Sequence, residues 1–222
     1  MKEKNFIFYD PDSLYYTKDV LMKGTGILLV LLMLLYSTRL LSISGDEAVE
    51  KFRGRMLRLE KLTGVISWTS LEGQTYSGSF KYLAPGKIYI KFSSPSEEIL
   101  VTDGRTLWIY SPGTKRCGIQ ELAKDATSGG IAALVAGYSG IAAERDAGYT
   151  LKLKKDESQY SEIILSVDAT FLLKGAIFKL NDGRIISFSL SDISTTAEVR
   201  PSLFNFKIPK GVQIVNSPLI IR

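Results

Sequence analysis

The sequence contains no histidine among its 222 residues. This absence excludes nucleophilic sites built on Ser-His or Cys-His pairs, histidine-ligated zinc and a histidine proton shuttle. The single cysteine, Cys117, cannot form an internal disulfide or a cysteine-based metal site, and it does not identify the compartment. A Gly-x-x-x-x-Gly-Lys-Ser/Thr phosphate loop is also missing. We therefore expect neither a resident metal nor a cofactor.

The charged residues give no sign of catalysis or of nucleic-acid binding. Four acidic residues that could attract interest, Asp103, Asp125, Asp182 and Glu121, stand at predicted turns or caps and lack the paired-carboxylate spacing of acid-base sites. The formal net charge is only +5, and the basic residues are scattered among acidic ones. The sequence therefore predicts a protein that is not an enzyme and has no nucleic-acid partner.

The N-terminal region has the pattern of an export signal. An apolar run over 27–35 follows Lys23 and precedes small residues at 42–44, and it is shorter than the roughly 20 residues that a spanning helix needs. We expect cleavage near Ser44, with 1–44 as extension and signal peptide and 45–222 as one mature domain. Acidic residues precede Lys23, whereas signal peptides normally begin with positive charge, so translation could start at either Met1 or Met22. An uncleaved N-terminal tether is the alternative.

One amphipathic helix is predicted to open the mature domain. Ser44 and Glu47 have the spacing with which two side chains satisfy free backbone groups at a helix start. Gly64 is expected to stop the helix. The helix either covers a core or lies on a membrane surface. Apolar residues then recur at steps of three and four: Val49, Phe52, Met56 and Leu59.

Beyond residue 65 the pattern changes to the two-residue period of β-strands. Turn-forming pairs punctuate the runs at the spacing of an antiparallel meander, and no alternation of strands with helices suggests a parallel sheet. The predicted strands are 65–71, 74–82, 87–92, 98–102, 106–110, 115–119, 149–154, 162–167, 171–180, 184–190 and 204–208.

The segment 120–147 interrupts this strand pattern. It combines small apolar residues with glycines, and we interpret it as two short helices that form a flap across one face of the sheet. The alternative is a helical insertion without a role of its own.

One face of the predicted sheet is apolar. In the run 87–92, Ile88, Ile90 and Phe92 share one side of the strand. One helix and a small flap can cover so many strands only if the sheet curls into an incomplete barrel. We therefore predict an α+β fold: an unclosed antiparallel half β-barrel covered by an N-terminal helix and a short helical lid. The interior is either filled by side chains or hollow for an apolar ligand.

Three ordered passages resemble the LolA family of periplasmic outer-membrane lipoprotein carriers. The passages are 99–112, with the sequence ILVTDGRTLWIYSP, then 124–127, KDAT, and finally 204–212, FNFKIPKGV. The resemblance covers roughly 46–215. The family motif residues are identified as Asp103, Gly104, Trp108, Tyr110, Phe204, Phe206 and Pro209.

The resemblance implies a cavity for acyl chains between the half-barrel and its lid. By motif position, Ile88, Ile90 and Phe92 are expected in the cavity wall, and Ile131, Leu134 and Val135 on the inward face of the lid. Trp108 and Tyr110 are expected to support the sheet. Each of these residues would equally suit a solid core.

One departure concerns the lid. Where the family's well-known member has Arg-Pro, with an arginine that helps to hold the lid shut, this chain has Ala84-Pro85. Lys81 or Lys87 could replace that arginine, or packing alone could close the lid.

The resemblance implies a monomeric periplasmic carrier that takes acylated lipoproteins from the inner to the outer membrane. Its implied partners are the acylated lipoproteins, an inner-membrane lipoprotein-releasing ABC transporter and an outer-membrane lipoprotein receptor. The alternative is a LolA-like protein for periplasmic lipid binding or envelope-stress sensing.

Overall fold

A single curled sheet dominates the computed structural model, which describes residues 43–122, 137–145, 147–155 and 160–216. The described residues lie in the unit Ile43–Arg222. They form twelve strands, one α-helix and one 3-10 helix, η3. The strands are β1 (Lys61–Thr69), β2 (Thr75–Leu83), β3 (Lys87–Ser94), β4 (Glu98–Thr102), β5 (Thr106–Ser111), β6 (Arg116–Glu121), β7 (Ser139–Arg145), β8 (Gly148–Lys154), β9 (Tyr160–Asp168), β10 (Leu173–Leu180), β11 (Ile185–Ser194) and β12 (Gln213–Asn216).

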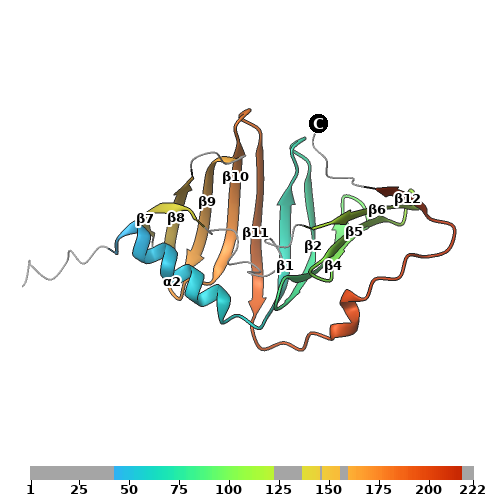
Figure 1. Cartoon of the computed structure of the whole chain (residues 1–222), viewed down its shortest axis with the longest axis horizontal. Coiled ribbons are helices and arrows are strands. Elements are labelled where there is room, and N and C mark those ends of the chain that lie inside the picture. The colour runs from blue at the N-terminus through green and yellow to red at the C-terminus, as the bar shows by residue number, and fades with distance from the viewer. Residues whose placement is uncertain (1–42, 123–136, 146, 156–159, 217–222) are drawn as a thin grey trace, which may run out of the picture. The chain divides into compact units, whose positions relative to one another are not determined.

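The sheet joins two antiparallel meanders through one non-local pair. Its order is β12-β6-β5-β4-β3-β2-β1-β11-β10-β9-β8-β7, so β1 pairs with β11 at the junction. The last strand, β12, pairs in parallel with β6. Within the described residues, β7 and β12 do not pair with each other, and the sheet stays open as predicted (Figure 1).

Helix α2 (Gly45–Leu57) covers one end of the sheet, over β7 and β8. The Ser44 half of the predicted cap is confirmed, because the Ser44 hydroxyl accepts a hydrogen bond from the Glu47 backbone N–H at 3.2 Å. The Glu47 carboxylate instead forms an ion pair with Lys51 at 2.9 Å. The predicted C-terminal end of the helix, at Gly64, was wrong. The helix ends at Leu57, and Gly64 lies inside β1. The buried face consists of Ala48, Val49, Phe52 and Met56.

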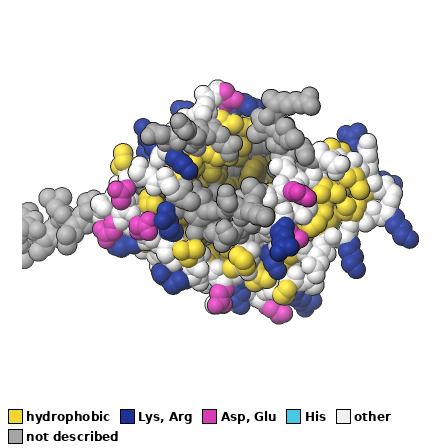
Figure 2. Space-filling view, in the orientation of Figure 1, with side chains coloured by type: hydrophobic (Ala, Val, Ile, Leu, Met, Phe, Trp, Pro, Cys, Tyr) yellow, Lys and Arg dark blue, Asp and Glu magenta, His cyan; other side chains and the backbone are white. Residues whose placement is uncertain are grey.

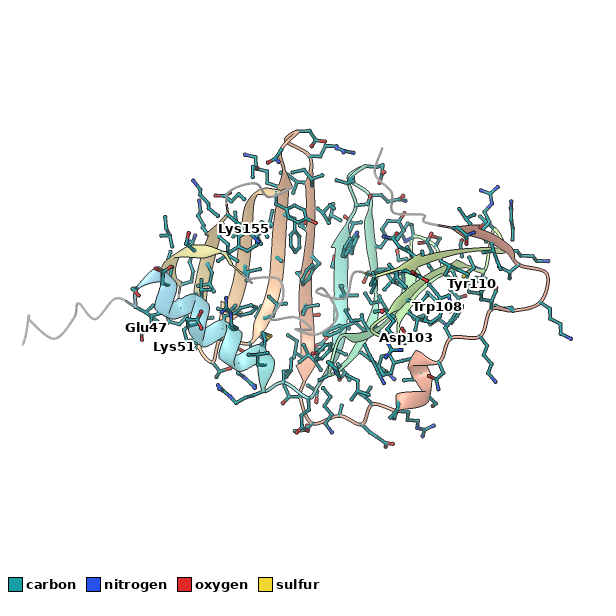
Figure 3. All side chains as sticks on the ribbon, viewed as in Figure 1. Glu47, Lys51, Asp103, Trp108, Tyr110 and Lys155 are labelled. Carbon is teal, nitrogen blue, oxygen red and sulfur yellow. The ribbon has the colours of Figure 1, made fainter. Side chains whose placement is uncertain are left out.

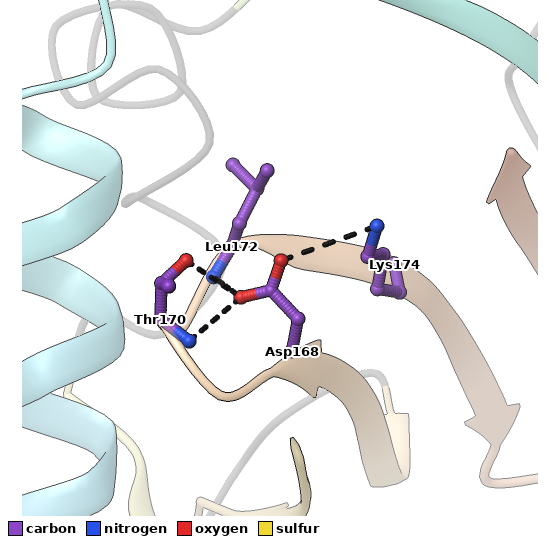
Figure 4. Close-up of polar contacts among 4 residues, drawn as sticks. All are labelled: Asp168, Thr170, Leu172 and Lys174. Carbon is purple, nitrogen blue, oxygen red and sulfur yellow. Dashed lines mark hydrogen bonds and ion pairs between the residues drawn. The ribbon is translucent and has the colours of Figure 1, made fainter. Parts of the chain in front are cut away.

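The turn between β9 and β10 holds an aromatic ring under α2. The Asp168 carboxylate accepts hydrogen bonds from the Thr170 hydroxyl at 2.7 Å, the Thr170 N–H at 2.8 Å and the Leu172 N–H at 3.0 Å (Figure 4). Phe171, at a φ of 61°, then stacks on Tyr149 with ring centroids 4.8 Å apart. Lys51 of α2 places its ammonium 5.9 Å from the same ring. The turn thus links the sheet to the helix.

Three segments differ from the sequence predictions. Residues 204–208 do not form a strand. Instead, η3 (Pro201–Phe204) and the irregular chain after it lie along the outer face of the sheet. Ser139–Arg145, predicted as part of a helical flap, is strand β7, and β12 was not predicted. No helix among the described residues has both the length and the apolar character that crossing a membrane requires.

Candidate functional site

The concave face of the curled sheet encloses an apolar cavity of about 530 Å³. The two-residue period of the strands turns alternate side chains of β1, β2, β3, β9, β10 and β11 toward this face. Figure 2 shows hydrophobic side chains gathered in the hollow. Ligand cavities span roughly 300–1,000 Å³, so the volume suits a ligand. The lining residues are Leu62, Ile66, Trp68, Phe80, Tyr82, Ile88, Ile90, Tyr138, Tyr160, Ile163, Leu173, Phe178, Ile186, Phe188 and Leu190.

A row of aromatic rings forms one end of this wall. Trp68 and Phe188 are cross-strand partners on β1 and β11, and their rings lie 6.3 Å apart with planes 6° from parallel. Phe178 lies 6.3 Å from Phe188 and 5.3 Å from Tyr160. Aromatic and β-branched side chains have few rotamers, so this wall is stiff.

The described wall of the cavity carries no formal charge. None of its described lining residues is Asp, Glu, Lys or Arg. Burial raises the pKa of Tyr82, although a hydrogen bond with the Gly86 backbone opposes this effect, so the phenol stays protonated at neutral pH. An uncharged wall of this kind can hold an apolar chain without the desolvation of a charge.

The predicted wall residues lie in two adjoining spaces. Ile88 and Ile90 line the cavity, and Phe92 lines a smaller pocket of about 210 Å³ beside it. Ile90 is also buried in the main core cluster, so it is both a wall and a core residue. The predicted lid residues Ile131, Leu134 and Val135 lie outside the described residues.

The Asp-Gly motif forms a tight turn between β4 and β5. The Asp103 carboxylate accepts hydrogen bonds from the backbone N–H groups of Arg105 and Thr106, both at 2.8 Å. Gly104 has a φ of 95°, a backbone conformation that favours glycine. These residues therefore shape a turn and do not line the cavity.

The aromatic motif residues pack on the outer face. Rings of Trp108 and Tyr110 on β5 lie 6.2 and 5.9 Å from Phe206. Phe204 is 1% exposed, whereas Pro209 is exposed. Trp108 and Tyr110 lie at the opposite end of the sheet from α2 (Figure 3).

Two further positions bear on the earlier predictions. Lys81 and Lys87 alternate with the cavity residues Tyr82 and Ile88, so their side chains belong to the outer face of the sheet.

Burial raises the pKa of the Cys117 thiol, which keeps the thiol protonated. No cluster of His, Cys, Asp and Glu among the described residues could hold a metal ion.

Sequence reasoning missed the wall contributed by β9, β10 and β11. The signal was present, because Ile186, Phe188 and Leu190 alternate along β11 and all line the cavity. Alternation identifies one face of a strand, but the same residue types also build a solid core.

The sequence matches the profile described as "Outer membrane lipoprotein carrier protein LolA" over residues 67–207. An outer-membrane lipoprotein carrier protein of Glaesserella parasuis is 30% identical over 149 residues, which cover 64% of this chain and 70% of that protein. A protein of the same name from Shewanella frigidimarina is 26% identical over 205 residues, or 84% of this chain and 94% of the relative.

The fold is also found among solved structures. The crystal structure of an uncharacterized conserved protein from Thermus thermophilus superposes with a TM-score of 0.52 at 12% identity. The match covers 77% of this chain and 97% of the Thermus chain, and at this identity it shows the fold alone.

Proposed function

Because this chain belongs to the LolA family of outer membrane lipoprotein carriers, we propose that it carries lipoproteins with their acyl chains held in the concave cavity. The observation that supports the proposal most directly is the neutral apolar hollow of about 530 Å³. Ile88 and Ile90 are its proposed acyl contacts, and Phe92 extends the wall into the adjoining pocket. Ile131, Leu134 and Val135 are proposed to cover the opening.

The energetics of acyl chains explain why such a cavity is needed. Each methylene removed from water contributes about 0.8 kcal/mol, so exposing a chain of ~15 methylenes costs on the order of 12 kcal/mol. The described cavity wall supplies apolar contacts without a charge that would have to lose its hydration. A carrier of this kind shields the chain during transfer through the periplasm.

Release requires that the next acceptor bind the chain more tightly than this cavity does. The sequence has no phosphate loop, so the energy for loading would have to come from a partner. Membership of the LolA family implies that this partner is an inner-membrane ABC transporter and that delivery is to an outer-membrane receptor, and we propose both for this chain. Export to the periplasm, with removal of 1–44, is part of the same proposal.

The proposal is tested with two neighbouring isoleucines of β11. Ile186 lines the cavity, whereas Ile185 is 50% exposed and does not. Ile186→Glu should weaken binding of a fluorescent fatty-acyl probe at least about tenfold, because a carboxylate in the wall must be desolvated. Ile185→Glu should bind as the wild type does.

Circular dichroism of both variants is the control for folding, and both spectra should match that of the wild type. Equal binding by the two variants, or no binding by the wild type, would refute an acyl site in this cavity. Capture of acylated lipoproteins from a native host supports the carrier function, whereas retention of free lipid alone supports the lipid-binding alternative.

A further inference from the structure

A second pocket of about 210 Å³ adjoins the apolar cavity across a shared wall. Trp68 and Ile90 line both spaces. The smaller pocket lies over β1 to β5, on the concave face. Its lining residues are Trp68, Tyr76, Ile90, Phe92, Glu98, Ile99, Leu100 and Ile109.

Three aromatic side chains from consecutive strands line this pocket. Trp68 on β1 and Tyr76 on β2 are cross-strand partners. The Tyr76 ring lies 5.6 Å from the Phe92 ring of β3, with the planes at 59°. The Tyr76 hydroxyl donates a hydrogen bond to the Gln74 side chain at 3.1 Å. The pocket therefore combines an indole, a phenol ring and a phenyl ring.

One acidic residue, Glu98, belongs to the lining of the same pocket. It is the cross-strand partner of Phe92, and it is only partly exposed. The preceding residue, Glu97, lies just before β4, does not line this pocket and forms an ion pair with Lys91 at 2.8 Å. By contrast, the Glu98 carboxylate has no ion pair or hydrogen bond with any residue that the structure describes.

This combination of groups suits an organic cation. Aromatic rings attract an ammonium group placed near their faces, and a carboxylate adds the opposite charge. A second acyl chain in this pocket would instead strip water from an unpaired carboxylate without compensation. The pocket volume is below the range of complete ligand cavities, which suits a head group and not a whole ligand.

We propose that the pocket beside Glu98 binds the ammonium group of an acylated ligand whose chain lies in the neighbouring cavity. This inference rests on the proposed acyl-binding function. It adds a charge preference, because ligands with a positive head group bind more tightly than neutral or anionic ones of the same chain length.

The test uses three single-chain probes below their micellar concentrations: dodecyltrimethylammonium, dodecyl maltoside and dodecyl sulfate. Calorimetry of the wild type should show the cationic probe binding about tenfold more tightly than the neutral one. Glu98→Gln should abolish that preference and leave the affinity for dodecyl maltoside unchanged. Glu97→Gln, the matched control at the preceding position outside the pocket lining, should keep the preference for the cationic probe.

A charge-reversing variant provides a second measurement. Glu98→Lys should favour dodecyl sulfate over dodecyltrimethylammonium. A wild type that binds all three probes equally, or a cation preference that survives Glu98→Gln, overturns the ammonium site but leaves acyl binding intact. Failure of the wild type to bind any of the probes instead overturns the proposed function.

Two arms distinguish the sources of such an ammonium group. One compares lysophosphatidylethanolamine with lysophosphatidylglycerol, and the other compares a palmitoylated peptide that carries a lysine with its glutamine counterpart. In either arm, a wild-type preference for the ligand that carries the ammonium group is compared with that of Glu98→Gln. If Glu98→Gln loses that preference, the ligand class of that arm is the source of the ammonium group. Absence of such a preference from both arms refutes a natural ammonium ligand.

Discussion

The Asp46 carboxylate at the start of α2 accepts a hydrogen bond from the backbone N–H of Gly140 in β7, at 3.3 Å. The adjacent Gly45 approaches the same residue of β7 so closely that a Cβ there would collide with the Gly140 carbonyl group. Helix and edge strand can meet in this way only because Gly45 has no side chain.

Gly45→Ala should therefore destabilise the protein, since the colliding atoms are backbone and the helix start must move. We expect a loss of about 1–3 kcal/mol in the free energy of unfolding, measured by urea denaturation. Gly54→Ala is the control. Its Cβ would meet only the flexible Arg58 guanidinium at 3.4 Å, so the better helix former should stabilise by up to about 1 kcal/mol.

The Asp168 turn should make stability depend on pH. Burial by itself would raise the pKa of Asp168, but the hydrogen bonds from Thr170 and Leu172, together with Lys174 at 4.0 Å, hold that pKa below its ordinary value. A lowered carboxyl pKa stabilises the folded state above the pKa of the unfolded chain, and this stabilisation is lost as the pH falls through the folded-state pKa.

Asp168→Asn should thus reduce the free energy of unfolding by about 1–3 kcal/mol at neutral pH. The difference from the wild type should shrink as the pH falls below about 4, where the wild-type carboxyl is protonated as well. Urea denaturation of both proteins at several pH values measures this difference in the free energy of unfolding. A difference that stays constant down to about pH 2 would contradict the assigned cause.

The outer segment 199–206 should be a large contributor to stability. Phe204 is fully buried, and truncation to alanine leaves a cavity, so Phe204→Ala should lower the free energy of unfolding by about 3–5 kcal/mol. The exposed Pro209 provides the control, and Pro209→Ala should unfold at nearly the wild-type denaturant concentration. Similar midpoints for both variants would show that the segment contributes little.

Cys117 should react slowly with thiol reagents in the native protein. Burial both hides the sulfur and raises the thiol pKa, so little thiolate forms at about pH 8. The alkylation rate should rise steeply in denaturant. Ser189→Cys in a Cys117→Ser background places a thiol on an exposed part of β11 and should react at the rate of a free cysteine.

The sequence predicted most strands correctly because half-buried strands show a two-residue period. The alternation of Ile88 and Ile90 with Lys87 and Lys91 identifies the face on which the cavity lies. The hollow itself was not predictable, since Ile90 belongs to both the core cluster and the cavity wall. Volume depends on how strongly the sheet curls, and composition does not encode that curl.

The wrong predictions have physical causes as well. Residues 139–145 are rich in alanine and charged helix formers, yet pairing with β8 and cover from α2 make them a strand. In 204–208, Phe204 and Phe206 alternate as in a strand, but they pack on the outer face of the sheet without ladder hydrogen bonds. Tertiary contacts therefore outweigh local pattern at both segments.

The pairing of β1 with β11 has a consequence for folding. Each meander can assemble from neighbouring stretches of chain, but this one seam joins segments from opposite ends of the domain and closes slowly. The aromatic pair Trp68 and Phe188 straddles the seam. A ligand that contacts both rings can bind only after this seam has formed, so its uptake during refolding reports the formation of the seam.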